Sequence, residues 1–341
     1  MPSSLLLLGL SLSFWLALRP LSRKRRSDAI PNYSERVLVI GASSGIGRAI
    51  AHIYAERGAK LCIVGRRGEE LETVRVECEG LLKDAEPASS NRVVSIKADF
   101  SDADDMIRVR TVLEQEWGVL DTLVVSAGVS ALQPLLHVAG VDGQTSDAGL
   151  PTVEGVRRTA DIALAATKGN YLGPLVSAVT LVYVFPDALP FLYLIFLACP
   201  IIQQIPFMSK SPSPSIHLIS SLAAVFPAPT RTLYASTKAA SLMLYRSLSI
   251  EHPNIAFSYL LPSTVEGDFR ASAVDSGPTR EADPNKHGLK RTAVAARAVR
   301  AIDNREGIVF MPQFYWLGHI LGCLWPSFVE RRARRKYNFP L

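Results

Sequence analysis

The chain has 341 residues and a formal net charge of +6, and 48% of its residues are hydrophobic. This length holds one large or two small domains. Positive charge gathers beside apolar stretches at residues 23–26 and 331–336, which favours an anionic membrane surface over nucleic acid as a partner; a solvated charge run or an import signal is the alternative. The four cysteines are scattered and form no metal-ligand pattern with histidine, so we expect reduced thiols in a cytosol-facing protein and no bound metal.

The amino terminus has an apolar run, residues 5–18, that precedes the basic residues 23–26. A secretory signal would carry its positive charge before the apolar run. The observed order instead places the following domain in the cytosol by the positive-inside rule. We predict that residues 1–27 are a membrane anchor with a basic flank and that residues 28–35 are a linker. A helix lying in one leaflet and a cleaved signal remain alternatives.

Residues 37–51 have the pattern of a strand, a glycine-rich turn and a helix. Four apolar residues, 37–40, lead into Gly41, which allows a sharp turn. Gly45 and Gly47 allow backbone N–H groups to approach a pyrophosphate and allow the helix to lie near the sheet. The pattern predicts a nucleotide site, and a purely structural turn between strand and helix is the alternative.

The next predicted strand, residues 60–64, is followed by two arginines. In a dinucleotide-binding fold, an acid at this point binds the ribose 2′-hydroxyl, whereas an arginine binds a 2′-phosphate. The first acid is Glu69. Arg66, with help from Arg67 or Arg48, therefore predicts NADPH rather than NADH, with a solvated arginine pair as the alternative.

The rest of the body alternates strands and helices, which implies a parallel, doubly wound sheet with ligands at the carboxyl ends of its strands. Asp99 follows the third strand and either accepts from the adenine amino group or caps a turn. The polar segment 263–290 is long enough to be a lid or a binding segment. The further strands are expected at 93–97, 122–125, 215–219, 256–260 and 307–311, and the helices at 69–82, 102–117 and 234–251.

Tyr234 and Lys238 lie four residues apart on one predicted helix, so they share a face. An ammonium group at this distance stabilises a phenolate and makes tyrosine a usable acid or base. Ser221 closes the strand that precedes this helix. The pair by itself is common on amphipathic helices, and its combination with Ser221 and the glycine loop indicates catalysis.

These motifs together resemble the short-chain dehydrogenase/reductase family: G-A-S-S-G-I-G at residues 41–47, I-S-S at 219–221 and Y-A-S-T-K at 234–238. The resemblance covers residues 36–311. It implies one Rossmann-type domain in which Tyr234 transfers a proton, Lys238 holds the nicotinamide ribose and Ser221 stabilises the substrate oxygen. Asn170, in a segment resembling the family's N-x-x-G, is assigned to a proton relay, with an ordinary helix polar residue as the alternative.

The resemblance also implies a set of NADP(H)-binding residues. Two departures from the family's motifs concern the nicotinamide end. The family's N-N-A-G is V-S-A-G here, at residues 125–128. The family's P-G is Pro262-Ser263 here, and the threonine that often follows is Gly267. Val265 is expected to contact the nicotinamide through its backbone. The predicted cofactor-binding residues are Gly41, Ser43, Ser44, Gly45, Ile46, Gly47, Arg66, Asp99, Ala127, Gly128, Tyr234, Lys238 and Val265.

Three further stretches extend this core. Residues 185–207 are strongly apolar but interrupted by prolines, so a single straight span is disfavoured. A membrane-dipping element or a cover over the substrate entrance fits, and an enlarged core or dimer interface is the alternative. Residues 312–341 combine aromatic and basic residues and predict a membrane-interface tail. The mostly polar residues 132–159 receive no role.

The sequence therefore predicts an α/β protein with an apolar N-terminal anchor and a C-terminal extension, anchored in the endoplasmic reticulum membrane with its catalytic domain facing the cytosol. Its expected activity is NADPH-dependent hydride transfer with a hydrophobic ketone or secondary alcohol, lipid or sterol-like. The alternatives are a 3-ketosphinganine reductase and a non-catalytic NADP-binding membrane scaffold. The expected partners are a hydrophobic small molecule, membrane lipid and a second copy in a homodimer, but not nucleic acid.

Overall fold

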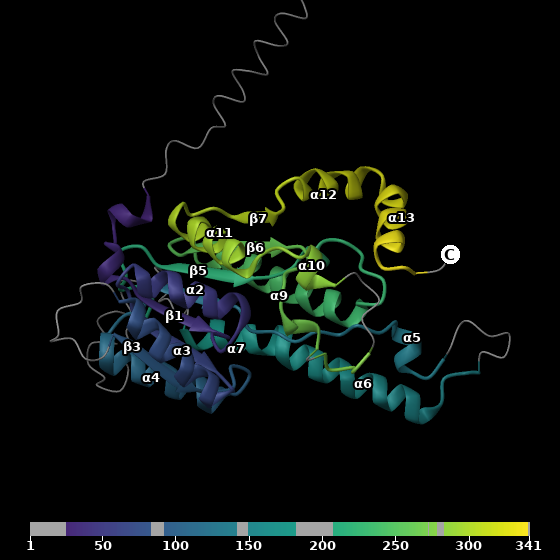
Figure 1. The fold of residues 1–341 in the computed structure, drawn as a ribbon, viewed down its shortest axis with the longest axis horizontal. Coiled ribbons are helices and arrows are strands. Elements are labelled where there is room, and N and C mark those ends of the chain that lie inside the picture. The colour runs from purple at the N-terminus through teal and green to yellow at the C-terminus, as the bar shows by residue number, and fades with distance from the viewer. Residues whose placement is uncertain are drawn as a thin grey trace, which may run out of the picture.

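The computed structural model describes residues 25–82, 92–141, 149–181, 207–271, 273–277 and 283–339. Within them, seven parallel strands form one sheet in the order β3-β2-β1-β4-β5-β6-β7 (Figure 1). The order reverses between β1 and β4, which is where ligands bind in sheets of this kind. The prediction of a parallel, doubly wound sheet is confirmed. The strands are β1 Arg36–Ile40, β2 Lys60–Gly65, β3 Val93–Lys97, β4 Thr122–Val125, β5 Ser215–Ile219, β6 Ala256–Pro262 and β7 Ile308–Met311.

Helices cover both faces of the sheet (Figure 1). Buried side chains of α2, α3 and α11 pack on one face, and those of α4, α7 and α9 pack on the other. The bounds are α2 Gly45–Glu56, α3 Gly68–Leu81, α4 Ala103–Trp117, α5 Leu135–Val138, α6 Val153–Thr167, α7 Gly173–Leu181, α9 Thr232–Glu251, α10 Pro284–His287, α11 Arg291–Asp303, α12 Tyr315–Leu324 and α13 Pro326–Lys336. Short 3₁₀ turns are η1 Arg26–Asp28, η2 Asn32–Ser34, η4 Leu222–Ala224 and η5 Asp268–Arg270, and η3 Lys168–Leu172 is a π-helical turn.

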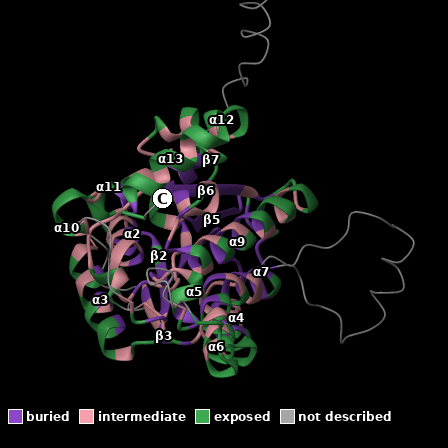
Figure 2. Ribbon diagram, turned by 90° about the vertical axis from the view of Figure 1, so that its right-hand side faces the viewer, coloured by how far each residue is buried: buried purple, intermediate pink, exposed green. Residues whose placement is uncertain are grey.

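The central strands are apolar on both faces because both faces are covered. Val37 and Val39 of β1 belong to one core cluster, and Leu38 and Ile40 belong to the other, as the alternation of side chains along a strand requires. All four are at most 1% exposed. Figure 2 shows the strands as a buried layer between partly exposed helices. This double burial holds the loops at the carboxyl edge of the sheet in fixed positions.

Local contacts move several predicted boundaries. The helix predicted from residue 102 begins at Ala103 because Asp102 is its N-cap and accepts from the Asp105 N–H at 3.0 Å. The helix predicted from residue 234 begins at Thr232, so Tyr234 lies in its first turn. The helix that contains Asn170 begins at Val153 as α6, passes through the π-helical turn and continues as α7. Part of the segment predicted as a polar insertion therefore belongs to the helix that carries Asn170.

The N-terminal basic cluster is not wholly available to a membrane surface. Arg26 is 2% exposed and forms an ion pair with Glu35. Its guanidinium also donates to the carbonyl oxygens of Ser213 at 2.8 Å and Asp121 at 2.9 Å. The predicted membrane role of residues 23–26 therefore does not hold for Arg26. In the segment predicted as a linker, Ile30 and Glu35 are buried against the domain.

Two apolar predictions fall outside the described residues. They are the run within residues 1–24 and residues 185–206 of the apolar insertion. Phe207, which ends that insertion, is described and packs in the core at 2% exposure. Among the described helices, none has both the length and the apolar character needed to cross a bilayer.

Candidate active site

A cavity of about 850 Å³ lies at the carboxyl ends of the central strands, and loops from both halves of the sheet line it. Almost all of the residues predicted for catalysis or cofactor binding border it, and Gly47 and Asn170 do not. The predicted residues that line the cavity are Gly41, Ser43, Ser44, Gly45, Ile46, Arg66, Asp99, Ala127, Gly128, Ser221, Tyr234, Lys238 and Val265. The fold thus brings residues from opposite ends of the sequence into one site.

The glycine loop after β1 needs its glycines for close approach. Gly41 has φ +86°, and a Cβ there would lie 2.5 Å from the backbone nitrogen of Ala127. A Cβ on Gly47 would lie 2.2 Å from the Gly41 carbonyl oxygen, so this glycine lets α2 pack on the loop rather than lining the cavity. The N-terminus of α2 begins at Gly45 beside the cavity. Its free N–H groups and dipole suit a pyrophosphate, so the loop fits a dinucleotide.

Both arginines after β2 line the cavity. Arg67 donates to the hydroxyls of Ser43 at 2.9 Å and Ser44 at 2.7 Å, so its guanidinium lies against the glycine loop. Arg48, the other predicted helper of Arg66, instead pairs with Glu77 and does not border the cavity. Arg67 was missing from the predicted cofactor set, although its place beside Arg66 was a usable signal.

Asp99 caps a turn and also faces the cavity. Its carboxylate accepts from the backbone N–H of Ser101 at 3.0 Å and from the Ser101 hydroxyl at 2.6 Å. Burial acts to raise the pKa of Asp99, but the two Ser101 hydrogen bonds and the Lys168 ammonium outweigh it and hold the pKa below its usual value. The cavity therefore has an ionised acceptor at this end.

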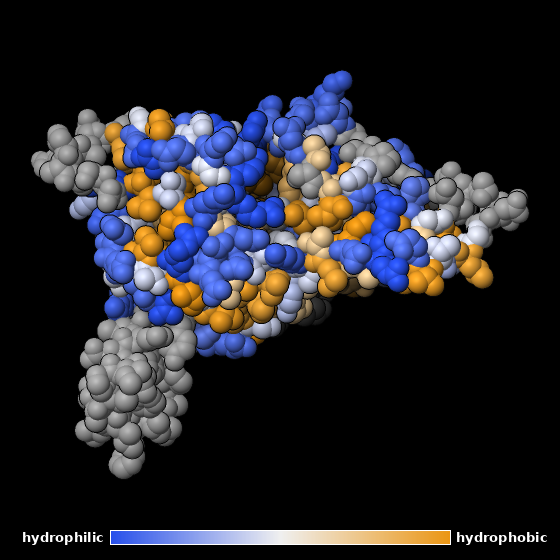
Figure 3. All heavy atoms as spheres, turned by 90° about the horizontal axis from the view of Figure 1, so that it is seen from below, coloured by the Kyte–Doolittle hydropathy of each residue, from blue (hydrophilic) through white to orange (hydrophobic). Residues whose placement is uncertain are grey.

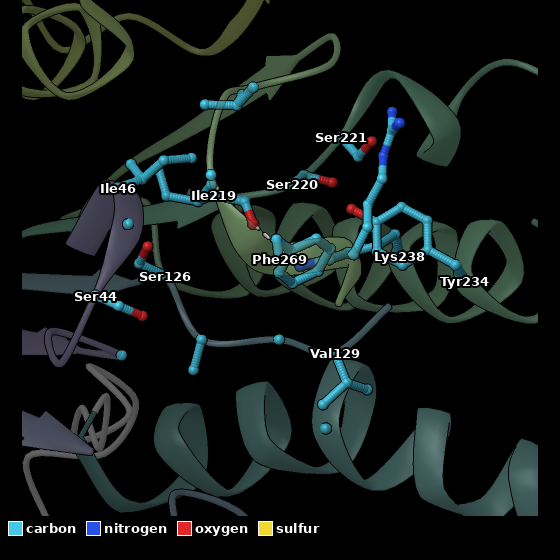
Figure 4. Close-up of a pocket in the computed structure, with 18 of the residues that line it drawn as sticks. Ser44, Ile46, Ser126, Val129, Ile219, Ser220, Ser221, Tyr234, Lys238 and Phe269 are labelled. Atoms are coloured by element: carbon cyan, nitrogen blue, oxygen red, sulfur yellow. Dashed lines mark hydrogen bonds between the residues drawn. The ribbon is translucent and has the colours of Figure 1, made fainter. Parts of the chain in front are cut away.

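The first two turns of α9 place Tyr234 and Lys238 at the opposite end of the cavity. Their exposed fractions are 7% and 5%. The Lys238 ammonium donates to the Ile219 carbonyl oxygen at 3.3 Å, which is the dashed line in Figure 4. Burial lowers the pKa of Lys238, and the negative charge of a Tyr234 phenolate opposes this effect. Figure 4 shows Ser221 and Tyr234 on the same side of the cavity, with Ser44 and Ile46 across from them.

Asn170 lies behind these groups in the π-helical turn and is fully buried. Its side-chain oxygen accepts from the Val129 N–H at 2.9 Å, and its side-chain nitrogen donates to the Val129 carbonyl at 3.0 Å and the Thr237 hydroxyl at 3.1 Å. A Cβ on Gly128 would lie 2.8 Å from the Asn170 oxygen and 3.1 Å from the Lys238 nitrogen. Asn170 and Lys238 therefore approach the same short piece of backbone, and the assignment of Asn170 to a proton relay stays a prediction.

Comparison with known proteins shows which family this chain resembles. Residues 35–145 match the short chain dehydrogenase family profile. The chain is 26% identical over 310 residues to an 11-beta-hydroxysteroid dehydrogenase A of Sesamum indicum, covering 88% of this chain and 75% of that protein. It is also 26% identical over 310 residues to a dehydrogenase/reductase SDR family protein 7-like of Dictyostelium discoideum, covering 90% and 83%. The chain is therefore similar to members of the short-chain dehydrogenase/reductase family.

Solved structures support the fold. An alcohol dehydrogenase from Thermococcus sibiricus, complexed with 5-hydroxy-NADP, aligns with a TM-score of 0.56 and 21% identity over 81% of this chain and 95% of its own. A short-chain dehydrogenase/reductase from Burkholderia phymatum, in complex with NAD, aligns with a TM-score of 0.63 and 16% identity over 87% and 96%. At these identities the two structures show the fold alone. The family profile and the sequence relatives support an oxidoreductase of alcohols or ketones that uses a nicotinamide cofactor.

The site also contains groups that the sequence patterns did not reveal. Ser220 is 4% exposed, lines the cavity and has no hydrogen-bond partner for its hydroxyl among the described residues. A buried polar atom in this state fits a site that receives a polar ligand. Arg231 lies over the ring of Tyr234, with 4.4 Å from its guanidinium carbon to the ring centroid, and Phe269 meets the same ring edge-on at 6.0 Å. The three-residue spacing of Arg231 and Tyr234 was a usable signal for the first contact, whereas no sequence spacing connects Phe269 with Tyr234.

Proposed function

We propose that the protein is an NADPH-preferring, membrane-associated oxidoreductase that interconverts a hydrophobic ketone and its secondary alcohol. The observation that carries this proposal is the placement of Ser221, Tyr234 and Lys238 in one cavity whose other end has the glycine loop and an arginine pair. A bound NADP(H) would be held by that loop and would exchange hydride at its nicotinamide ring.

The residues of this chain handle the proton and the charge on oxygen. Tyr234 donates its phenolic proton to the carbonyl oxygen in reduction and accepts a proton from the alcohol in oxidation. The Ser221 hydroxyl donates to the same substrate oxygen and stabilises its developing charge. The Lys238 ammonium stabilises the phenolate, and Asn170 supports the path by which Tyr234 is reprotonated. The presence of all four groups favours an enzyme over a non-catalytic cofactor-bound scaffold.

The preference for NADPH follows from charge at the adenosine end. Arg67 is held against Ser43 and Ser44, and Arg66 lines the same part of the cavity. Two guanidinium groups there would pair with a 2′-phosphate, whereas the unphosphorylated ribose offers them no anion.

The proposed substrate is a sterol-like ketone or alcohol. Three plant relatives named as 11-beta-hydroxysteroid dehydrogenases or as like them support this choice over 3-ketosphinganine, which is the second candidate. Leu222 and Phe269 supply apolar surface in the cavity near Tyr234. Such a substrate partitions into membranes, so an enzyme at the bilayer surface would reach it.

The C-terminal extension supports membrane association. Phe314, Leu324 and Trp325 are 62%, 77% and 55% exposed, and the basic residues of α13 follow them. Exposed apolar and aromatic side chains beside basic ones suit the surface of an anionic bilayer. Lys336 and Tyr337, at the end of α13, also line the cavity, which links this surface to the site. The predicted anchor at residues 1–27 and residence in the endoplasmic reticulum membrane, with the catalytic domain in the cytosol, remain parts of the proposal.

A homodimer is a further part of the proposal. Helix α6 lies along the lower side of the molecule in Figure 1, and the face seen from below in Figure 3 has apolar side chains among hydrophilic ones. Val153, Val156 and Leu164 of α6 are 76%, 56% and 67% exposed. An isologous pairing through this helix would cover them.

Turnover by the purified full-length protein in detergent tests the proposed activity. NADPH consumption is followed with steroid ketones and with 3-ketosphinganine, and the reverse reaction is followed with the matching alcohols. We expect turnover with a sterol-like ketone and a loss of about a thousandfold or more in Tyr234→Phe, since the proton donor is removed. Tyr33→Phe, which changes an exposed tyrosine outside the cavity lining, is the matched control and should retain full activity. Absence of turnover in both directions would contradict an enzymatic role.

A further inference from the structure

Arg231 has a place in the site that the four family catalytic groups do not explain. It is the N-cap residue of α9, is 8% exposed and lines the cavity. Its guanidinium carbon lies 4.4 Å from the centroid of the Tyr234 ring. Resting on the proposed function, we infer that Arg231 is a positioning residue for Tyr234, which orients the phenol ring and stabilises the negative charge that the ring gains during proton transfer.

The physical basis is the attraction between a cation and the face of an aromatic ring. As the phenol gives up its proton, the ring becomes more electron-rich, so the attraction grows between the ground state and the transition state. Only an interaction that grows in this way speeds the chemical step. Arg231 precedes Tyr234 by three residues, and Lys238 follows it by four. The three side chains therefore lie on one face at the beginning of α9, with a cationic side chain on each side of the phenol.

The guanidinium is itself held by a buried partner. Arg231 donates to the hydroxyl of Ser130 at 2.9 Å, and Ser130 is fully buried in the loop after β4. The Ser130 carbonyl accepts from the Val274 N–H at 2.9 Å. Asp275, the next residue, accepts from the Leu132 and Gln133 N–H groups at 2.6 and 2.7 Å. Arg231 is therefore tied to a loop that is joined by hydrogen bonds to the segment around Asp275.

The same region of the chain contacts Tyr234 from a second direction. Phe269 of η5 meets the Tyr234 ring edge-on, with centroids 6.0 Å apart and planes at 65°. Figure 4 shows Phe269 beside Lys238 and Tyr234. The phenol ring is thus held at its face by Arg231 and by Phe269 in a second, edge-to-face contact. Loss of the arginine would free the ring to turn about its side-chain bonds and would remove one of the two flanking cations.

Three variants of the full-length protein in detergent separate this role from a merely structural one. Arg231→Met keeps the length and apolar contacts but removes the charge, Arg231→Lys keeps the charge without the planar group, and Ser130→Ala removes the hydrogen bond that holds the guanidinium. For each variant, kinetics give kcat, the KM of the ketone and the solvent deuterium isotope effect on kcat. Tryptophan fluorescence gives the stoichiometry and the affinity of NADPH binding.

We expect kcat to fall about tenfold or more in Arg231→Met and about three- to fivefold in Arg231→Lys and Ser130→Ala. The KM of the ketone and the NADPH affinity should stay within about twofold, because Arg231 acts on Tyr234 rather than on binding. The solvent isotope effect should rise in Arg231→Met, because proton transfer from Tyr234 becomes slower.

Two results would overturn the inference while leaving the proposed function standing. One is an Arg231→Met kcat within about twofold of wild type while Tyr234→Phe is inactive. The other is an Arg231→Met protein in which kcat falls only as far as the fraction of molecules that bind NADPH falls. In that case the solvent isotope effect would also be unchanged. Should Arg231→Met not bind NADPH at all, Arg231→Lys decides: a lower kcat with full NADPH binding supports the role, and an unchanged kcat overturns it. Wild-type activity in Tyr234→Phe would instead contradict the proposed function.

Discussion

At the scale of single residues, two neighbouring arginines have different surroundings. Arg67 is fixed by hydrogen bonds to Ser43 and Ser44, whereas Arg66 lines the cavity beside it. The sequence pattern pointed first to Arg66, because it follows the strand more closely. The side-chain contacts show that Arg67 is the guanidinium already held against the glycine loop. A fixed guanidinium loses less conformational entropy when it binds a phosphate.

We therefore expect Arg67→Ser to weaken NADPH selectively. A charge-assisted hydrogen bond contributes about 1.5–3 kcal/mol, so kcat/KM with NADPH should fall by about 10- to 100-fold, and kcat/KM with NADH should change little. Arg48→Ser is the matched control, because Arg48 pairs with Glu77 away from the cavity. Steady-state kinetics with both cofactors checks this expectation, and an equal loss with NADPH and NADH would refute it.

At the scale of elements, the C-terminal extension is a pair of helices with little burial. Helices α12 and α13 project from the top of the molecule in Figure 1, and none of their residues is fully buried. Their aromatic rings do make a few contacts with the body, such as those of His319 with Phe226 and Phe310. An amphipathic pair attached in this way can lie on a bilayer without spanning it.

Tryptophan quenching can test that placement in the full chain. In vesicles of brominated, anionic phospholipid, we expect Trp316 and Trp325 to be quenched, because they lie on the exposed face of this pair at 46% and 55% exposure. The Trp316→Phe/Trp325→Phe protein should then lose much of the quenching seen in wild type. Trp117→Phe, at the end of α4 and packed against the core, is the control and should retain it. Equal fractional quenching in the wild type and the double variant would argue against membrane contact by this pair.

At the scale of the whole molecule, buried polar groups join the sheet to its surroundings. The ion pair of Arg26 with Glu35 fixes the start of the described chain to the sheet, and Asp121 is tied to Arg36 and Ser211. His217 of β5 is fully buried and shares a hydrogen bond of 2.5 Å with the Ser258 hydroxyl of β6. Burial lowers the pKa of His217 to about 3, and the charge of Arg297 acts in the same direction.

Global stability should therefore fall at acidic pH through His217. The unfolded chain takes up a proton on this histidine near pH 6.5, but the folded chain does so only near pH 3. The unfolded state binds more protons between these values, so the free energy of unfolding falls as pH decreases through that window, by up to about 1.4 kcal/mol per pH unit from this group.

Urea unfolding of wild type and His217→Gln between pH 7 and pH 4, in the same detergent, measures this contribution. Glutamine stays neutral throughout, so the variant should lose stability less steeply below about pH 6.5, whatever its stability at neutral pH. Parallel curves for the two proteins would show that His217 does not contribute to the acid sensitivity.

How much could be predicted from sequence depended on how local the signal was. The glycine loop, the alternation of apolar strands and the spacing of Tyr234 and Lys238 are set by nearby residues. Strand period, turn chemistry and helix period act over a few positions, so the fold class and the cavity-lining residues of the glycine loop could be predicted. The parallel, doubly wound sheet then followed from the alternation of strands and helices.

Only the tertiary structure decided which distant side chains meet. Arg26 reaches Ser213, Arg231 reaches Ser130, and Asn170 is held by Val129 across loops that no local pattern connects. Burial and charge pairing are sums over contacts far apart in the chain. The sequence by itself therefore determined the sheet, the glycine loop and the pairing of Tyr234 with Lys238 on one helix. The fold decided which arginine is buried, which contacts the glycine loop and which lies over the ring of Tyr234.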